Sequence, residues 1–218
     1  MGLSSCYITL LAMRKLFSIG ALLLLASCGM TEDDKEADKR VTYIEFSDEA
    51  FERYCLDNYD LNADGRFSKY EAERVLYIDC SGMGVESLYG IENFVQLREL
   101  RCSDNEISYL ELNRNVELEY IECRNNRLSL LAVDELRVLY SLDCSENLLP
   151  QLDLRFNNAL AELNCSSNEL KLLDCSNTSR SMRLLDCSNN PNLEVLYLHS
   201  NQTFEKIFVD GWVEIQYK

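Results

Sequence analysis

The chain of 218 residues is long enough for one sizeable domain with a small appendage, and its hydrophobic content of 47% is ordinary for a globular protein. Its 37 acidic residues outnumber 21 basic ones, which gives a formal net charge of -16 at pH 7. Because so acidic a chain repels the phosphates of nucleic acids, we exclude nucleic acid as a partner. The charge favours cations, basic proteins or plain solubility instead.

The first 27 residues have the pattern of a bacterial export signal. A basic pair at positions 14 and 15 precedes an apolar run over residues 17–26, which is too short to span a bilayer as a helix. The run ends in Leu-Ala-Ser-Cys at residues 25–28, which resembles the lipobox of bacterial lipoproteins. The resemblance implies cleavage before Cys28 and acylation of its thiol, so that the membrane is reached through the lipid anchor only. An ordinary signal peptide or a short membrane anchor is the alternative.

Residues 28–42 are highly charged and lack an apolar period, which predicts a flexible acidic tether. Acidic residues directly after the lipid cysteine resemble the surface-export signal of lipoproteins in some Gram-negative anaerobes. The resemblance implies a bacterial outer-membrane lipoprotein that is exposed at the cell surface.

Residues 43–74 are expected to form a small helix-loop-helix cap, in which Ser47 caps the first helix. The loop at residues 60–71 reads Asp-Leu-Asn-Ala-Asp-Gly-Arg-Phe-Ser-Lys-Tyr-Glu and matches the EF-hand pattern at every ligand position. The resemblance implies a Ca²⁺ site whose oxygens come from Asp60, Asn62, Asp64, the Arg66 carbonyl, Ser68 and Glu71. Since no second loop is found, we expect structural Ca²⁺ and no sensor. A loop that keeps its shape without metal is the alternative.

From residue 75 onward the sequence repeats every 21 or 22 residues, with a cysteine in each unit at Cys80, Cys102, Cys123, Cys144, Cys165 and Cys187. The frame Leu97-x-x-Leu100-x-Cys102-x-x-Asn105-x-Ile107 recurs in the units that follow. It resembles the leucine-rich-repeat signature with Cys in the third apolar slot. Residues 87–94 resemble the opening repeat of internalin-like proteins. The expected fold is therefore a leucine-rich-repeat solenoid of about six coils over residues 75–203, mainly β with short parallel strands.

The cysteine column has three interpretations. A metal ladder would need clustered Cys-x-x-Cys pairs, which the repeat lacks. A series of disulfides is possible by distance, but parallel in-register side chains suit the disulfide torsion poorly. We favour buried free thiols that act as small hydrophobic groups.

Residues 204–218 depart from the repeat and are expected to form a C-terminal cap, because the end of a solenoid otherwise exposes its core. The segment alternates as strands do, with a plausible turn at Asp210-Gly211. Trp212 is interpreted as part of the core of this cap.

Residues between the apolar strand positions of a leucine-rich repeat face outward and form the usual binding sheet. The candidate partner-binding face comprises Glu99, Arg101, Tyr120, Glu122, Arg124, Asp143, Glu162, Asn164 and Asp186. Among these, Tyr120, Arg101 and Arg124 are the types that dominate binding hot spots. The face is mildly acidic, so a basic protein would fit it. A solvated scaffold face without a ligand is the alternative.

No catalytic pattern is present in the sequence. His199 is the sole histidine, no serine lies in a nucleophile-elbow pattern, and no glycine-rich phosphate loop exists. The order of the EF-hand-like loop, the internalin-like repeat, the cysteine-bearing repeats and the cap resembles a group of leucine-rich-repeat lipoproteins of Gram-negative anaerobes. We therefore expect a monomeric, non-enzymatic, lipid-anchored surface protein for protein interaction. A structural envelope lipoprotein without a ligand is the alternative, and a glycan-processing enzyme is a more distant one.

Overall fold

The computed structural model describes residues 41–218, of which residues 42–218 form one compact unit. The expected signal peptide, the acylated Cys28 and nearly all of the tether lie outside the described residues. Within residues 41–218, no helix is long and apolar enough to cross a membrane.

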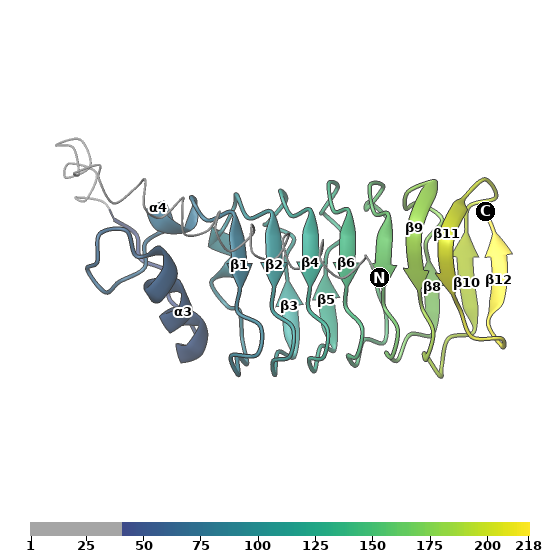
Figure 1. The fold of residues 1–218 in the computed structure, drawn as a ribbon, viewed down its shortest axis with the longest axis horizontal. Helices are drawn as coiled ribbons and strands as arrows, with labels where there is room; N and C mark the ends of the chain where they lie inside the picture. The colour runs from purple at the N-terminus through teal and green to yellow at the C-terminus, as the bar shows by residue number, and fades with distance from the viewer. Residues whose placement is uncertain (1–40) are drawn as a thin grey trace, which may run out of the picture. The chain divides into compact units, whose positions relative to one another are not determined.

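The compact unit is a solenoid whose larger layer is a seven-stranded parallel sheet, in which the strands stand side by side in sequence order (Figure 1). The middle residue of each short strand, such as Leu100, Ile121 or Leu142, is buried and lies in register with its counterparts. The strands are β1 (Tyr77–Asp79), β2 (Glu99–Arg101), β4 (Tyr120–Glu122), β6 (Ser141–Asp143), β7 (Glu162–Asn164), β9 (Ser181–Asp186) and β11 (Thr203–Phe208).

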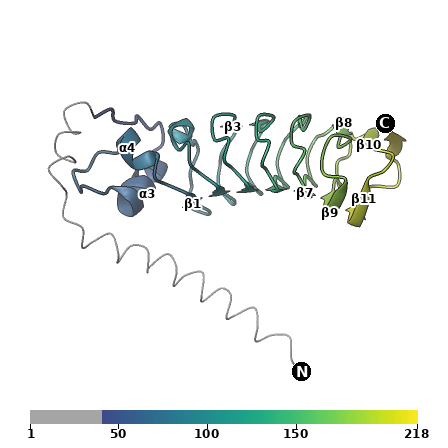
Figure 2. The same ribbon diagram turned by 90° about the horizontal axis from the view of Figure 1, so that it is seen from above.

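The second half of each coil forms the opposite layer (Figure 2). This layer is divided into two sheets because the coil between them has no strand. Elsewhere in the layer a backbone bond links neighbouring coils at the same position, as from Ser129 N to Ser108 O at 3.0 Å. Pro150 occupies that position in the divided coil and has no N–H to donate. The two sheets consist of β3 (Tyr109–Glu111) with β5 (Leu130–Ala132), and of β8 (Leu172–Asp174), β10 (Val195–Leu198) and β12 (Glu214–Tyr217).

An asparagine column closes the turn after five of the seven strands of the larger sheet, at Asn105, Asn126, Asn147, Asn168 and Asn190. The Oδ1 atom of Asn126 accepts a hydrogen bond from Ile107 N, and its Nδ2 donates to the carbonyls of Cys102 and Cys123. Buried backbone groups of two coils are thereby paired. The residue before each of these asparagines has a left-handed backbone, at Asp104, Asn125, Glu146, Ser167 and Asn189.

The cysteine column is a ladder of free, buried thiols, which confirms the favoured interpretation. Burial raises the pKa of the Cys102 and Cys123 thiols well above the ordinary value, so both remain protonated at neutral pH. The ladder begins one step before the repeats, since Cys55 in the N-terminal helix is also buried and lies near Cys80.

The N-terminal end is closed by helix α3 (Glu49–Tyr59), with the short α4 (Lys69–Ala72) beside it (Figure 1). Asp48 caps α3, where the sequence suggested Ser47: its Oδ1 accepts from Ala50 N and Phe51 N at 2.9 Å. Its Oδ2 accepts from Glu86 N at 2.7 Å, which ties the start of the helix to the first coil. That coil also contains the 3₁₀ helix η2 (Ile91–Asn93).

Residues 203–217 do not cover the C-terminal end as a cap would. β11 pairs in parallel with β9, and β12 pairs in parallel with β10, so the segment adds one more coil to the solenoid. Trp212, expected in a cap core, is 62% exposed. The difference arises because strand-like alternation is the same in a cap as in a further coil.

Candidate functional site

The candidate partner-binding residues all lie on the outer side of the larger sheet or just after its strands. The register places Glu99 beside Tyr120, Arg101 beside Glu122, and Asp143 beside Asn164. Arg124 follows the end of β4 by two residues, and Asp186 ends β9. The structure therefore brings the predicted residues onto one continuous surface, carried by a rigid sheet.

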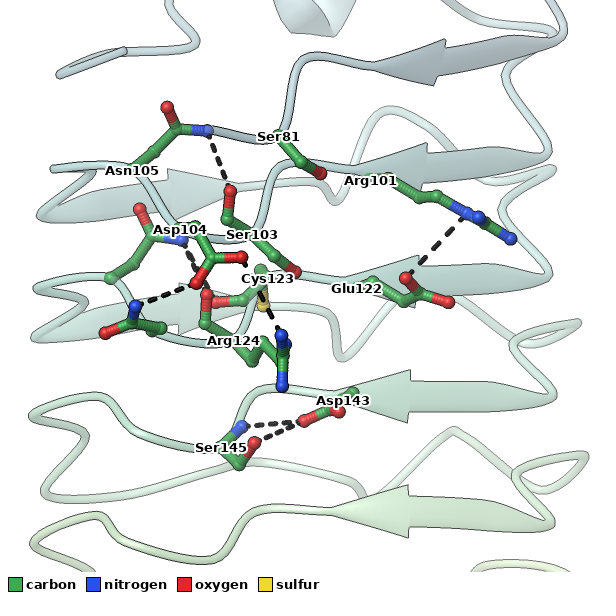
Figure 3. Close-up of polar contacts among 12 residues, drawn as sticks. Ser81, Arg101, Ser103, Asp104, Asn105, Glu122, Cys123, Arg124, Asp143 and Ser145 are labelled. Atoms are coloured by element: carbon green, nitrogen blue, oxygen red, sulfur yellow. Dashed lines mark hydrogen bonds and ion pairs between the residues drawn. The ribbon is translucent and has the colours of Figure 1, made fainter. Parts of the chain in front are cut away.

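Arg101 and Arg124 lie on neighbouring coils, and both are paired with carboxylates (Figure 3). Arg101 donates from Nε to Glu99 Oε1 at 2.8 Å and lies 3.8 Å from Glu122. Arg124 lies 3.8 Å from Asp104. Coulombic attraction from the glutamates outweighs burial and raises the pKa of Arg101 further. These arginines present planar groups for binding while part of their charge is neutralised.

An Asp-Cys-Ser unit shapes the turn after several other strands. Asp143 Oδ1 accepts hydrogen bonds from Ser145 N at 3.0 Å and from Ser145 Oγ at 2.6 Å (Figure 3). Asn164 and Asp186 make the same pair of bonds to Ser166 and Ser188. These three candidate residues therefore hold the local turn, and only their remaining side-chain atoms are available to a partner.

The unit is interrupted in the coil of Arg101. Arg101 takes the place of the aspartate and has no acceptor to offer, so the buried Ser103 hydroxyl has no partner within the described chain. In the next coil Arg124 replaces the serine itself. Each replacement removes a hydrogen bond from the turn and places an arginine on the outer surface. A role in binding therefore explains the two arginines better than a role in stabilising the turn.

An aromatic and basic cluster lies beside these arginines and was missed from the sequence. The Tyr120 ring packs against Tyr140 with centroids 5.9 Å apart, and Arg183 donates to the Tyr140 hydroxyl at 3.4 Å. Arg183 also forms an ion pair with Glu162 at 2.9 Å. Tyr140 lies just before β6 and Arg183 lies within β9, at positions that the sequence analysis did not consider. We call Glu99, Arg101, Tyr120, Tyr140, Glu162 and Arg183 the Tyr120 patch.

The EF-hand-like loop is organised around its own backbone. Asp60 Oδ2 accepts from Gly65 N, Asn62 Oδ1 accepts from Asp64 N, and Asp64 Oδ1 accepts from Arg66 N. Ala63 and Gly65 both have positive φ, which lets the loop turn sharply. The acidic and amide side chains expected to bind metal therefore already point toward the inside of the loop.

Glu71 closes the loop by joining its beginning and its end. Its Oε1 accepts from Leu61 N at 2.9 Å, while its Oε2 accepts from the N–H and hydroxyl of Ser68. Ser68 in turn caps α4, so its hydroxyl is already engaged. Glu71 is nearly fully buried, and the two residues therefore have a structural role whether or not a metal is bound.

The segment at residues 42–44 pairs with the loop through backbone hydrogen bonds, in the position that the second loop of an EF-hand pair would take. Ile44 N donates to Phe67 O, and Lys69 N donates to Thr42 O. From this segment, the Tyr43 hydroxyl donates to Asp64 Oδ2 at 3.2 Å, and the Arg66 guanidinium stacks on the Tyr43 ring. Slight desolvation raises the pKa of Asp64, but the hydrogen bonds that it accepts from Arg66, Asn62 and Tyr43 outweigh this and lower it.

The fit of the loop to a cation rests on one atom. Asp60 Oδ1 is buried and has no hydrogen-bond partner within the described chain, which leaves an orphaned carboxylate oxygen at the first ligand position. Across residues 41–218, however, no group of three or more His, Cys, Asp or Glu side chains is gathered as a metal site. The donor set is that of a hard cation, and the loop would have to contract around it.

The chain was compared with known proteins. No family model and no curated protein matches it. Among similar solved structures is the functional domain of InlJ from Listeria monocytogenes, which includes a cysteine ladder. It is 27% identical, with a TM-score of 0.59 over 73% of this chain and 39% of that chain. The present chain thus spans about two fifths of the InlJ domain.

Two further internalins of Listeria monocytogenes are also among the similar solved structures. InlF is 19% identical, with a TM-score of 0.48 over 71% of this chain and 50% of that chain. InlC2 is 17% identical, with a TM-score of 0.46 over 78% of this chain and 94% of that chain.

Proposed function

Because residues 42–218 form an internalin-like leucine-rich-repeat solenoid with a cysteine ladder, we propose that the protein is a non-enzymatic surface protein that binds another protein. The observation that carries this proposal is the Tyr120 patch on the larger sheet. Tyrosine and arginine are side chains enriched in binding hot spots. Here Tyr120, Tyr140 and Arg183 adjoin on the sheet, and Arg101 lies on the strand β2 beside that of Tyr120.

The chemistry of the patch favours a basic partner with an apolar or aromatic anchor. Tyr120 is 43% exposed and provides the contact area. Around it, Glu99 and Glu162 belong to ion pairs whose charges cancel only locally in a strongly acidic chain. A basic rim on the partner would therefore be steered toward the sheet, and its association rate would fall with added salt.

Site-specific photo-crosslinking tests the patch. A photoreactive phenylalanine analogue at Tyr120 should capture a discrete partner from host or bacterial surface extracts, and Arg101→Ala should reduce the capture about tenfold or more. The matched control is the same analogue at Tyr109, a more exposed tyrosine on the opposite layer. Equal capture at both positions, or none at Tyr120, would favour a structural envelope protein without a ligand.

We further propose that the loop at residues 60–71 binds Ca²⁺ as a structural cofactor. Asp60, Asn62, Asp64, the Arg66 carbonyl and Glu71 would hold the ion, with Ser68 acting through water because its hydroxyl already bonds Glu71. The orphaned Asp60 oxygen supports this assignment. The ion would supply charge that relieves repulsion among these carboxylates, and it would stiffen the cap against the first coil.

Thermal melts test the calcium proposal. For residues 29–218, Ca²⁺ at one to ten times its Kd should add about 0.4–1.4 kcal/mol over chelator. The corresponding rise in Tm is roughly 1–5 °C. Asp60→Asn should abolish the rise while leaving the Glu71 bonds in place. An equal melt in chelator and in millimolar Ca²⁺ would instead show a loop that keeps its shape without metal.

The proposed location is the bacterial cell surface, with the protein held by a lipid on Cys28. The support is the lipobox-like sequence at residues 25–28 and the acidic residues after it. Labelled palmitate should be incorporated by the wild-type chain and lost in Cys28→Ala, and protease added to intact cells should remove the protein. Labelling that persists in the variant would refute the anchor.

A further inference from the structure

The outer face of the larger sheet carries two tyrosine rings at a defined spacing. The register aligns Tyr77 of β1 with Glu99 of β2 and Tyr120 of β4, so the two tyrosines stand two coils apart in one column. Tyr77 is 38% exposed and Tyr120 is 43% exposed. The Arg101 guanidinium lies 5.9 Å from the centre of the Tyr77 ring. Tyr77 therefore extends the aromatic and basic surface of the Tyr120 patch to the first coil.

This spacing matches one conformation of an extended peptide. Neighbouring parallel strands lie about 4.8 Å apart, so two coils measure about 9.6 Å. A polyproline II helix rises about 3.1 Å per residue and repeats every three residues, so the same side of it recurs about every 9.3 Å. A β-strand presents alternate side chains about every 6.7 Å, which matches neither one coil nor two. A polyproline II segment lying along the solenoid would therefore meet both rings in the same way.

The face suits such a segment better than an amphipathic helix. A helix docks with its apolar stripe in a hydrophobic groove. The residues that flank the buried middle residues of β1, β2, β4, β6 and β7 are aromatic, charged or polar, and none is aliphatic. Separate rings on a polar surface are the feature that proline-rich segments recognise in their binding domains.

Hydrogen-bond donors accompany the rings. A polyproline II segment has no internal hydrogen bonds, so its carbonyl groups need donors from the surface that binds it. The Tyr120 hydroxyl has no hydrogen-bond partner within residues 41–218 and can donate to such a carbonyl. Arg183 already donates to the Tyr140 hydroxyl and pairs with Glu162, and its exposed guanidinium has further N–H groups to offer.

The charge of this face selects the chemistry of the segment. The ten residues that flank the middle residues of β1, β2, β4, β6 and β7 include five acids and a single base, Arg101. Glu122 and Asp143 are neighbours in register on this face (Figure 3). A segment with basic residues between its prolines would therefore be attracted along its whole length.

We propose that the partner binds through a basic, proline-rich segment in the polyproline II conformation, which runs along the solenoid over Tyr77, Tyr120 and Tyr140. This inference rests on the proposed function, because it names the kind of partner that the Tyr120 patch takes. From β1 to β9 the larger sheet makes five steps between neighbouring strands. These steps span about 24 Å, the length of about eight residues of polyproline II.

Two synthetic peptides of equal charge test the conformation. One has four Pro-Pro-Arg repeats and the other four Gly-Gly-Arg repeats, each with a fluorescent label. Fluorescence anisotropy with residues 29–218, which contain the compact unit, measures both dissociation constants in 0.15 M salt. The proline peptide should bind at least tenfold more tightly, because it is already in the bound conformation, whereas the glycine peptide binds through charge alone.

Substitutions test the place of binding. Tyr77→Ser and Tyr120→Ser should each weaken binding of the proline peptide at least fivefold, and Tyr120→Phe should have a smaller effect because it keeps the ring. The matched control is Tyr109→Ser on the opposite layer, which should change nothing. The Tyr109 hydroxyl donates to Glu111, just as the Tyr77 hydroxyl donates to Asp79.

Three results would overturn the proposal. They are equal binding of the two peptides, no binding of the proline peptide, and binding of it that survives both serine substitutions. The photo-crosslink at Tyr120 tests the proposed function separately. A partner captured there while the two peptides bind alike would be a basic protein that docks in another conformation.

Discussion

The two ends of the solenoid solve the same problem differently. At the N-terminal end α3 buries Phe51 against Phe46 and Phe94, and two tyrosine hydroxyls satisfy the edge of β1. At the C-terminal end a further coil repeats the pattern and leaves core positions such as Ile207 exposed. Each further coil buries the apolar face of the coil before it and exposes an equivalent face of its own. Only an element of another kind, such as α3, covers that face.

The largest expected effect concerns the thiol ladder, which runs from Cys55 in the cap and stops before the last coil, where Val209 takes the cysteine position. Burial raises the pKa of every rung, to about 12 for Cys80 and Cys187. Above pH ~9 each thiol of the folded protein keeps its proton, whereas the same thiol of the unfolded chain loses it. The contribution of the thiols to the free energy of unfolding is therefore fully present below that pH and falls as pH rises. The loss is about 1.4 kcal/mol per thiol per pH unit.

Melts under reducing conditions between pH 7 and 11 check this effect. Cys144→Ala should melt at a lower temperature at pH 7 but lose less stability with rising pH, because one titrating rung is absent. A wild type and a variant with the same slope would show that the thiols do not control alkaline unfolding.

The cap and the open end should respond very differently to loss of an aromatic side chain. Phe51→Ala should lower the free energy of unfolding by about 3–5 kcal/mol, because it empties the core beneath α3. Trp212→Ala should cost the monomer less than about 1 kcal/mol, because the ring is mostly exposed. Urea unfolding measures both, and similar costs would mean that the C-terminal end is covered after all.

A smaller change tests how the N-terminal edge is closed. Tyr54→Phe keeps the ring but removes the acceptor for Asp79 N, and should cost about 1–2 kcal/mol. Its control is Tyr70→Phe, on the exposed face of α4, which should be neutral. An equally small effect of both would indicate that water replaces the hydroxyl of Tyr54.

The smallest effect is a gain in stability within a middle coil. Glu146 has a φ of 55° at the position where three other coils have Asp or Asn, side chains that tolerate a left-handed backbone better. Glu146→Asn should therefore raise the free energy of unfolding by about 0.5–1 kcal/mol. Ser129→Asn, at a position without a left-handed backbone, serves as the control and should bring no gain.

The sequence predicted the repeating part of the fold because a periodic structure needs the same residue at the same place in each coil. The cysteine and asparagine columns follow directly from the spacing. The last coil could also have been recognised as a repeat from the sequence, since Phe204-x-x-Ile207-x-Val209 matches the frame with other apolar residues in its slots. It was missed because the asparagine that normally follows is absent.

Other features depend on contacts that no local pattern contains. Asn115 and Asn157 are fully buried and donate to carbonyls of the preceding coil, in a second column that skips the coil of Leu136. The Tyr120 patch combines residues of the predicted face with Tyr140, which precedes β6, and Arg183, which lies within β9, and both look like ordinary surface positions in the sequence. The hydrogen bond between Tyr54 and the edge of β1 likewise could not be predicted without knowing where α3 lies in the fold.

Amide hydrogen exchange on residues 29–218, at a concentration where the chain is monomeric, tests the difference between the two ends most directly. The account predicts strong protection of residues 77–79 beneath α3 and fast exchange at outward amides of residues 203–217, although both segments are terminal strands. In Tyr54→Phe the protection of residues 77–79 should fall. Equal protection of the two ends in the wild-type monomer would contradict the account.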